Sequence, residues 1–403
     1  MPILINIGLL ASCRDEGGQD AIHTIPQAAL AWRGTDIEWV GPAAALPSQY
    51  RDDEHSDAEG RLVVPGLIDC HTHLAFAGSR ADEVEARIRG RSYLELAAAG
   101  GGIARTVAAT RSASTDVLID GCAMWLSAMA RLGITTVEAK TGYALDLENE
   151  TRVLEVYEAV RHKQPVRLVS TLLAAHVVPP EYAGRREQYV EMVCNELIPA
   201  VARRSLVRYC DVFVEESAFT PGEARTILRR AGEHGLGAKL HVDQFTDGGG
   251  AALAAELNAV SADHLECASA DGIARLARAG TVAVTLPVAA LYLGRPAAPA
   301  RSLIAAGVPV AVATDFNPGT APTFHLPLAM LLAATLQRMT PAEVLKAVTI
   351  YAARAVGEAP ATGSLEPGKR ADFAIIDAPD VNHWVYYFTP NSCLSTYIGG
   401  VRV

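Results

Sequence analysis

The sequence lacks any hydrophobic run of the length, about 20 apolar residues, that a membrane-spanning helix needs. Residues 1–10 are apolar, but they have no basic leader and are followed closely by Arg14, Asp15 and Glu16. This pattern predicts a β-strand rather than a signal peptide. We therefore expect a cytoplasmic protein without a membrane partner.

Cysteine pairs and an excess of basic residues are also lacking. The seven cysteines are scattered and form no Cys-x-x-Cys motif, which favours reduced, mostly buried thiols over a disulfide or zinc framework. The net charge of -10 argues against non-specific binding to nucleic acid, so no such partner is expected. The glycine triplets at 100–102 and 248–250 match neither common phosphate-binding motif.

What the sequence does contain is enough apolar material for a large core: half of its 403 residues are hydrophobic. Both ends have strand-like patterns, with a polar segment, 49–60, that predicts an exposed turn. The predicted terminal strands are 3–10, 28–33, 36–40 and 373–377, with further strand-like sequence up to residue 403. These patterns predict a small β-sandwich built from residues 1–64 and 357–403.

The middle of the chain, residues 65–356, alternates strand-like and helix-like segments. Eight strands are predicted, at 67–71, 134–139, 167–173, 210–214, 238–241, 259–263, 282–286 and 308–314. Amphipathic segments lie between them, including 116–132, 147–162, 221–234, 269–279 and 301–306. Eight such units predict an α/β fold with a (β/α)₈ TIM-like barrel rather than a doubly wound sheet.

Two histidines end the first of these strands. His71 and His73 are spaced two apart, so a strand places both imidazoles on one face. Neutral imidazole is a preferred ligand of zinc and iron. The tripeptide alone also fits a chance His-x-His on a surface strand. However, His241, His264 and Asp315 also fall at predicted strand ends, where such barrels carry their active sites.

Several motifs make the chain similar to a known family. Residues 65–73, the isolated His241, Asp315 and residues 363–372 resemble the amidohydrolase superfamily. Residues 100–111, 140–146, 261–266 and 313–322 resemble the imidazolonepropionase family within it. The resemblance covers nearly the whole chain. It implies metal-dependent hydrolysis of the ring amide of 4-imidazolone-5-propanoate to N-formimidoyl-L-glutamate, in histidine degradation, and we expect a homodimer.

The resemblance implies four metal ligands, His71, His73, His241 and Asp315. Such a set with one position open to water is typical of a catalytic site. Two-metal relatives carry a bridging lysine at the end of the fourth strand, whereas residues 210–215 contain none. We therefore expect one divalent ion, zinc or iron. Lys140 follows the second strand and is interpreted as a supporting lysine.

Further residues are assigned to catalysis. His264 and Asp315 are the acid/base candidates, because a histidine beside a metal titrates near the working pH and a ligating carboxylate can share a proton with water. Asp263 alternates with His264, so it is expected to point away and to be structural. Gln244 stands where many deaminases of the superfamily have glutamate. Its amide cannot ionise, which favours simple hydrogen bonding to the substrate ring.

Substrate contacts come mainly from the resemblance. Arg80 matches the arginine that pairs with the substrate carboxylate. The other matching or candidate contacts are Tyr143, His176, Asn317, Gly319 and Thr320, while Tyr93 is either a contact or a packing residue. Two alternatives remain: a related metal-dependent cyclic amidohydrolase or deaminase, and a non-catalytic interaction protein on the same barrel. Loss of metal ligands would indicate the last, and all four are present.

Overall fold

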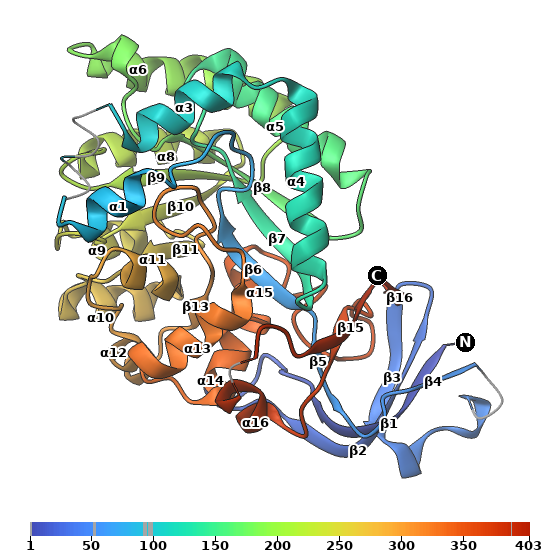
Figure 1. Cartoon of the computed structure of the whole chain (residues 1–403). Coiled ribbons are helices and arrows are strands. Elements are labelled where there is room, and N and C mark those ends of the chain that lie inside the picture. The colour runs from blue at the N-terminus through green and yellow to red at the C-terminus, as the bar shows by residue number, and fades with distance from the viewer. Residues whose placement is uncertain (1, 51–53, 92–94, 96–99, 388) are drawn as a thin grey trace.

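The computed structural model describes residues 2–50, 54–91, 95, 100–387 and 389–403. One of its two eight-stranded sheets is parallel, and its strands follow one another in chain order around a barrel (Figure 1). All eight predicted strands are confirmed, with bounds that agree to within two residues. They are β6 (Leu67–Thr72), β7 (Ile134–Lys140), β8 (Arg167–Ala175), β9 (Tyr209–Val214), β10 (Gly237–Val242), β11 (Ser261–His264), β12 (Val282–Thr285) and β13 (Val310–Val312).

The barrel is closed by the segment that follows β13. The backbone N–H of Asp315 donates to the carbonyl of His71 at 3.1 Å, and the N–H of His73 donates to the carbonyl of Phe316 at 2.8 Å. The last strand therefore meets the first through residues 315 and 316. This closure brings Asp315 beside the two histidines that end β6.

Helices cover the outside of the barrel. The predicted helices are confirmed as α4 (Thr115–Ala130), α5 (Leu147–Arg161), α8 (Pro221–Glu233), α10 (Ala270–Ala279) and α12 (Ala300–Ala305). Polar caps begin several of them: Ser114 accepts from Val117 N, and Thr220 with Glu223 forms a full capping box. Within the described residues, the other α-helices are α1 (Glu83–Ile88), α3 (Gly102–Ser112), α6 (Arg186–Met192), α7 (Ile198–Arg203), α9 (Gly250–Glu256), α11 (Pro287–Tyr292), α13 (Leu326–Leu336), α14 (Pro341–Ala347), α15 (Ile350–Ala355) and α16 (Val381–Tyr386).

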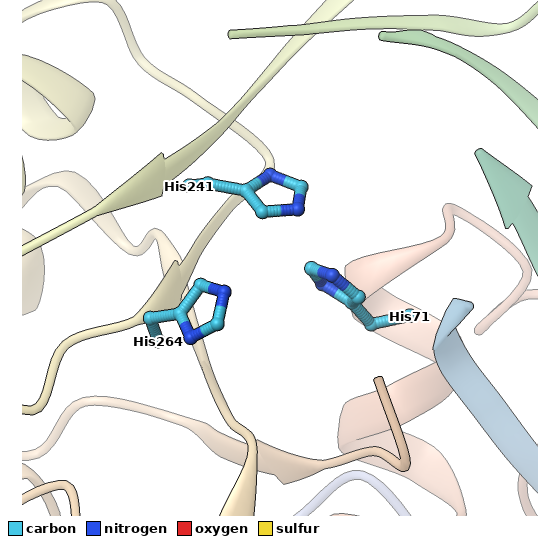
Figure 2. A group of neighbouring side chains, drawn as sticks. All are labelled: His71, His241 and His264. Atoms are coloured by element: carbon cyan, nitrogen blue, oxygen red, sulfur yellow. The ribbon is translucent and has the colours of Figure 1, made fainter. Parts of the chain in front are cut away.

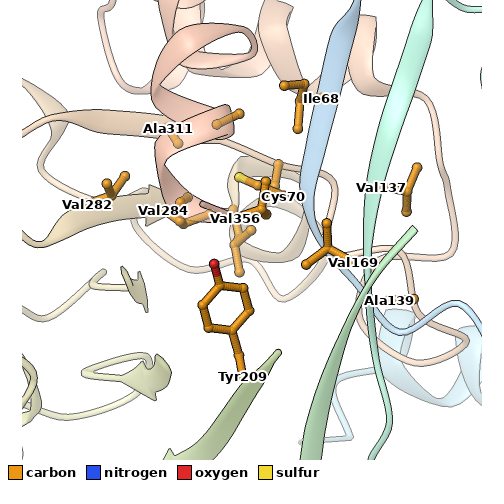
Figure 3. Packing of buried hydrophobic residues seen from close by; sticks show 14 of the residues in the cluster. Ile68, Cys70, Val137, Ala139, Val169, Tyr209, Val282, Val284, Ala311 and Val356 are labelled. Atoms are coloured by element: carbon orange, nitrogen blue, oxygen red, sulfur yellow. The ribbon is translucent and has the colours of Figure 1, made fainter. Parts of the chain in front are cut away.

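Apolar side chains from neighbouring strands pack into one continuous core. Figure 3 shows part of it, where Ile68 and Cys70 of β6, Val169 of β8 and Val284 of β12 are fully or almost fully buried. Close packing of this kind resists displacement of the strands. The core therefore fixes the strand ends, where the polar residues of the site begin.

The two chain ends form a second, mixed sheet. It joins β1 (Ile3–Ala11), β2 (Thr24–Arg33), β3 (Asp36–Pro42), β4 (His55–Asp57), β5 (Leu62–Pro65), β14 (Phe373–Ile376), β15 (Cys393–Ile398) and β16 (Val401–Arg402). Trp32 of β2 lies 5.4 Å from Phe373 of β14 between ring centroids, although two strands separate β2 from β14 in the sheet. The sheet therefore curls around its own core, in agreement with the sandwich-like packing expected of the termini. We propose that residues 1–64 and 357–403 form this unit and residues 65–356 the barrel.

One local prediction is wrong. Within the polar segment 49–60, predicted as an exposed turn, His55–Asp57 form β4 and pair in parallel with Ile3–Ile5 of β1. The side chains of β4 are polar and mostly exposed, so composition indicated solvent contact but not the pairing of the backbone. Residues 51–53 lie outside the described residues.

The cysteines and helices agree with the composition. All seven cysteines are free, and five of them are buried. No helix within the described ranges combines the length and apolar character that crossing a membrane requires.

Candidate active site

Three imidazole rings from different strands converge at one end of the barrel. His71 ends β6, His241 lies in β10 and His264 ends β11, and their rings face a common space (Figure 2). The ring centroid of His71 is 4.5 Å from that of His241 and 5.9 Å from that of His264. All three side chains are buried.

His73 and Asp315 complete this group. Oδ1 of Asp315 lies 3.4 Å from Nε2 of both His71 and His73. Possible ligand atoms of His71, His73 and Asp315 lie within 4.8 Å of one another, as do those of His71, His241 and His264. The structure thus brings together the four residues predicted as metal ligands, with His264 beside them.

The hydrogen bonds of these histidines fit a bound cation. Nδ1 of His71 contacts Oδ2 of Asp263 at 2.6 Å, and Nδ1 of His241 contacts Oδ1 of Asp211 at 3.0 Å. Nε2 of each ring is buried and makes no hydrogen bond. Metal-binding histidines commonly use one nitrogen for a carboxylate and the other for the ion. The residues present therefore fit a divalent metal.

The pKa shifts within the cluster also fit a bound cation. Burial lowers the pKa of His73 and, despite Asp211, holds the pKa of His241 well below its ordinary value. Burial alone would also lower the pKa of His71, but Asp263 and Asp315 raise it to about 9. Burial disfavours the Asp315 carboxylate, yet His71 and His73 hold its pKa well below the usual range. A cation would displace the proton of His71, because only the neutral ring is a ligand.

The predicted orientation of Asp263 is wrong. The alternation of a regular strand would turn Asp263 away from the side of His264, but both residues face the site. His264 and Leu265 have positive φ angles of 80° and 68°, so the strand ends and turns at His264. This turn lets two consecutive side chains reach the same cluster.

A cavity of about 270 Å³ opens beside the cluster. Most of the predicted catalytic and substrate residues line it, namely Arg80, Tyr143, His176, His264, Gln244, Asp315, Asn317 and Thr320. The His176 ring stacks on His73 at a centroid distance of 5.3 Å, and the Tyr143 ring lies 5.6 Å from His73. Burial lowers the pKa of His176 to about 3, so its ring is neutral at ordinary pH. The cavity thus has a flat aromatic wall next to the histidine–aspartate cluster that fits a cation.

Comparison with known proteins decides the family. The amidohydrolase family model matches residues 62–403. An imidazolonepropionase of Geobacillus thermodenitrificans is 48% identical over 365 residues, which are 90% of this chain and 86% of that protein. One of Pseudomonas syringae pv. tomato is 47% identical over 90% of this chain and 91% of its own length. The chain belongs to the imidazolonepropionase family.

Solved structures share the fold of this imidazolonepropionase-family chain at much lower identity. Escherichia coli guanine deaminase is 15% identical with a TM-score of 0.72, over 100% of this chain and 99% of that one. The atrazine chlorohydrolase of Arthrobacter aurescens, solved with zinc, is 17% identical with a TM-score of 0.69, over 100% of this chain and 95% of that one. The barrel with a second terminal sheet is thus a known arrangement.

Arg80, which the family resemblance selected, is a buried residue. Only 4% of it is exposed, and Nε donates to Oε2 of Glu83 at 3.0 Å. Gly319 does not line the cavity itself, but a Cβ at this position would lie 2.2 Å from Nη1 of Arg80. Gly319 therefore leaves room for the guanidinium group.

Asn317 organises the loop that carries Thr320. Its amide donates to the carbonyl of Asp315 at 2.6 Å and to Oγ1 of Thr320 at 3.1 Å, and its Oδ1 accepts from Gly319 N and Thr320 N. These bonds fix the loop next to Asp315. A direct contact of Asn317 with substrate stays a prediction, and Tyr93 lies outside the described residues.

Sequence reasoning missed Asp211 and gave Glu138 and Lys239 no part in the site. All three are fully buried within barrel strands, below the histidines. The available signal was a charged residue inside an otherwise apolar strand, since such groups are rarely buried unless paired. Their partners, however, lie on other strands and are not visible in the sequence.

Proposed function

We propose that this chain hydrolyses the ring amide of 4-imidazolone-5-propanoate and releases N-formimidoyl-L-glutamate, a step of histidine degradation. As a member of the imidazolonepropionase family it is a hydrolase that acts on the carbon–nitrogen bond of a cyclic amide. The observation that carries the substrate assignment is a buried arginine, Arg80, in the same cavity as the histidine–aspartate cluster. That cavity can hold a flat ring and a carboxylate together.

We assign one divalent ion, zinc or iron, to His71, His73, His241 and Asp315. The superfamily consists of metal-dependent hydrolases, and the Nε2 atoms of His71 and His241, which are buried and make no hydrogen bond, support the assignment. When bound, such an ion polarises a carbonyl group and lowers the pKa of water. In this structure β9 ends at Val214 and is followed by Glu215, which leaves no lysine there to bridge a second ion.

Asp315 and His264 handle the proton and the developing charge. Oδ1 of Asp315 lies within the cluster, 3.4 Å from Nε2 of both His71 and His73, where the carboxylate can accept a proton from the attacking water. It then returns that proton to the ring nitrogen, which leaves as part of an amidine. His264 donates a hydrogen bond to the oxygen on which negative charge develops, a form of electrostatic help that often dominates catalysis.

The remaining cavity residues orient the substrate. Arg80 pairs with the propionate, so binding energy is converted into orientation of the ring above the cluster. Tyr143 and His176 contact the ring, Gln244 hydrogen-bonds to it, and the loop of Asn317, Gly319 and Thr320 holds a second polar group. Gln244 is 7% exposed, and its amide cannot shuttle a proton, which argues against a deaminase.

The test follows ring opening by ultraviolet absorbance with purified protein of known metal content, and identifies the product. We expect N-formimidoyl-L-glutamate and a much lower kcat/KM for an imidazolone without the carboxylate. Losing a charge-assisted pair costs about 1.5–3 kcal/mol, or roughly ten- to over a hundredfold. Equal efficiency on both compounds excludes the role of Arg80, and a different product excludes the assignment.

We also propose a homodimer in the cytoplasm. The seven free cysteines fit a reducing compartment. Light scattering of the purified chain measures the number of subunits directly.

A further inference from the structure

A network of buried charges lies directly below the histidine cluster, and Lys140 is at its centre. Lys140 ends β7, and its side chain has no exposed surface. Its Nζ lies 2.7 Å from Oδ2 of Asp211, 3.2 Å from Oδ2 of Asp263 and 3.2 Å from Oε1 of Glu138. An ammonium group has three N–H donors, so three carboxylates can satisfy it completely.

Two of these carboxylates are the ones that bind the metal-site histidines. Asp211 contacts Lys140 through Oδ2 and His241 through Oδ1. Asp263 contacts both Lys140 and Nδ1 of His71 through Oδ2. Each carboxylate therefore lies between the ammonium group on one side and an imidazole on the other.

We propose that Lys140 is a positioning residue of the metal site: its ammonium group fixes Asp211 and Asp263 so that His241 and His71 both turn Nε2 toward the ion. The proposal deepens the proposed function and rests on its metal assignment. Two buried carboxylates without a cation between them would repel each other, so one of them would turn away from the other. That movement would release the Nδ1 atom of the histidine that it contacts.

The charge state of the network is consistent with this role. Burial disfavours the ammonium of Lys140, but Asp211, Glu138 and Asp263 raise its pKa well above the ordinary value. Burial likewise disfavours the carboxylate of Asp263, but Lys140, Lys239 and His71 hold its pKa well below the usual range. The surrounding carboxylates therefore favour the charged form of the lysine.

Lys239 offers a matched control in the same barrel. It is equally buried, it lies on β10 two residues before His241, and it also contacts Glu138, with Nζ 2.8 Å from Oε2. Its other hydrogen bond goes to the carbonyl of Ala355 at 3.1 Å. Replacing Lys239 removes the same buried charge but leaves the contacts of Lys140 with Asp211 and Asp263 in place.

The sign of the effect on metal affinity separates two roles. If Lys140 acted only as a positive charge, its removal would reduce repulsion of the metal and tighten binding. If it positions the carboxylates, its removal weakens metal binding. Loss of a residue that orients metal ligands through hydrogen bonds typically costs about 10–100-fold in metal affinity. Glutamine is the suitable replacement because its amide still donates two hydrogen bonds.

The experiment measures Co²⁺ affinity by competition with a chromophoric chelator, together with the absorption spectrum of bound Co²⁺. We expect Lys140→Gln to bind Co²⁺ about 10–100-fold more weakly, with a changed spectrum. Lys239→Gln should keep the parent spectrum and an equal or higher affinity. Parent-like or tighter binding by Lys140→Gln overturns the proposal, as does an equal loss in both variants.

A charge-balanced variant keeps the test decisive if Lys140→Gln does not fold. Lys140→Gln combined with Glu138→Gln removes one anion along with the cation, and we expect Co²⁺ affinity at least about tenfold below the parent. Parent-like affinity in this variant overturns the proposal. Neither measurement involves the substrate, so a wrong substrate assignment would appear separately, as a parent enzyme that binds metal but does not open the imidazolone ring.

Discussion

Replacing Gly319 with alanine tests the link between the loop after Asp315 and the arginine in the cavity. The added Cβ would lie 2.2 Å from Nη1 and 2.9 Å from Cζ of Arg80. Ordinary contact needs about 3.5 Å, so the guanidinium group has to move by at least about 1 Å. The φ angle of Gly319 is not in the left-handed region, so alanine causes no backbone strain. Most of the effect should therefore fall on Arg80, because the other close atom, Oδ1 of Asn317 at 3.2 Å, has to give by only a few tenths of an ångström.

The expected loss follows from the role proposed for Arg80. A displaced guanidinium forfeits up to about 1.5–3 kcal/mol of a charge-assisted pair with the propionate, or roughly ten- to over a hundredfold in kcat/KM. The loss should appear in kcat as well as in KM, because the pair both binds the substrate and orients its ring. The assay is steady-state ring opening of 4-imidazolone-5-propanoate by Gly319→Ala, Arg80→Met and the double variant.

Two outcomes decide the reasoning. In the Arg80→Met background, Gly319→Ala should have a much smaller effect, because the guanidinium group is gone and only the 3.2 Å contact with Oδ1 of Asn317 remains. Gly232→Ala is the control: Gly232 lies in α8 and an added Cβ there meets nothing within 4 Å. If Gly319→Ala keeps its efficiency within about twofold of the parent, Arg80 does not hold the substrate carboxylate in the proposed position.

Three further results are expected. Asp315→Asn should lower kcat by at least the 10²–10⁴-fold that acid/base help is worth, even with metal bound, and turnover within a few-fold of the parent would refute this role. Elemental analysis of active protein should find one divalent ion per chain; two ions, both required for activity, would contradict the single-ion site. Thr220→Ala should remove the capping box of α8 and reduce the free energy of unfolding by about 0.5–2 kcal/mol in denaturant titrations, without changing kcat/KM. Unchanged stability would show that the cap contributes nothing.

The barrel could be predicted from the sequence because its strands are apolar runs separated by amphipathic segments. Strand ends then located His71, His241 and Asp315, since a barrel gathers the carboxyl ends of its strands. The closure through Asp315 and Phe316, by contrast, depends on backbone hydrogen bonds between segments more than 240 residues apart. Only the folded structure reveals that seam.

The errors have a common physical source. Period-two alternation assumes a regular strand, and it failed at Asp263 because His264 and Leu265 take positive φ angles. Polarity indicates solvent exposure, and it failed at β4 because an exposed strand can still pair its backbone. Lys140 was recognised as a supporting lysine, but its partners Asp211 and Asp263 come from β9 and β11, which no local pattern connects.

The charges around the site are consistent with the divalent ion that we propose. Among the described residues, the carboxylates of Glu138, Asp211, Asp263 and Asp315 lie beside its histidines and lysines, and Oε2 of Glu266 lies 3.6 Å from Nδ1 of His264. The buried ammonium groups beside them are those of Lys140 and Lys239, so negative charge is in excess, which a divalent cation would offset. Uncompensated charge is costly in a buried site. Without the ion, His71 offsets part of it by holding a proton, as its pKa of about 9 indicates. The residues that orient the metal-site histidines therefore also set how much positive charge the site can bind.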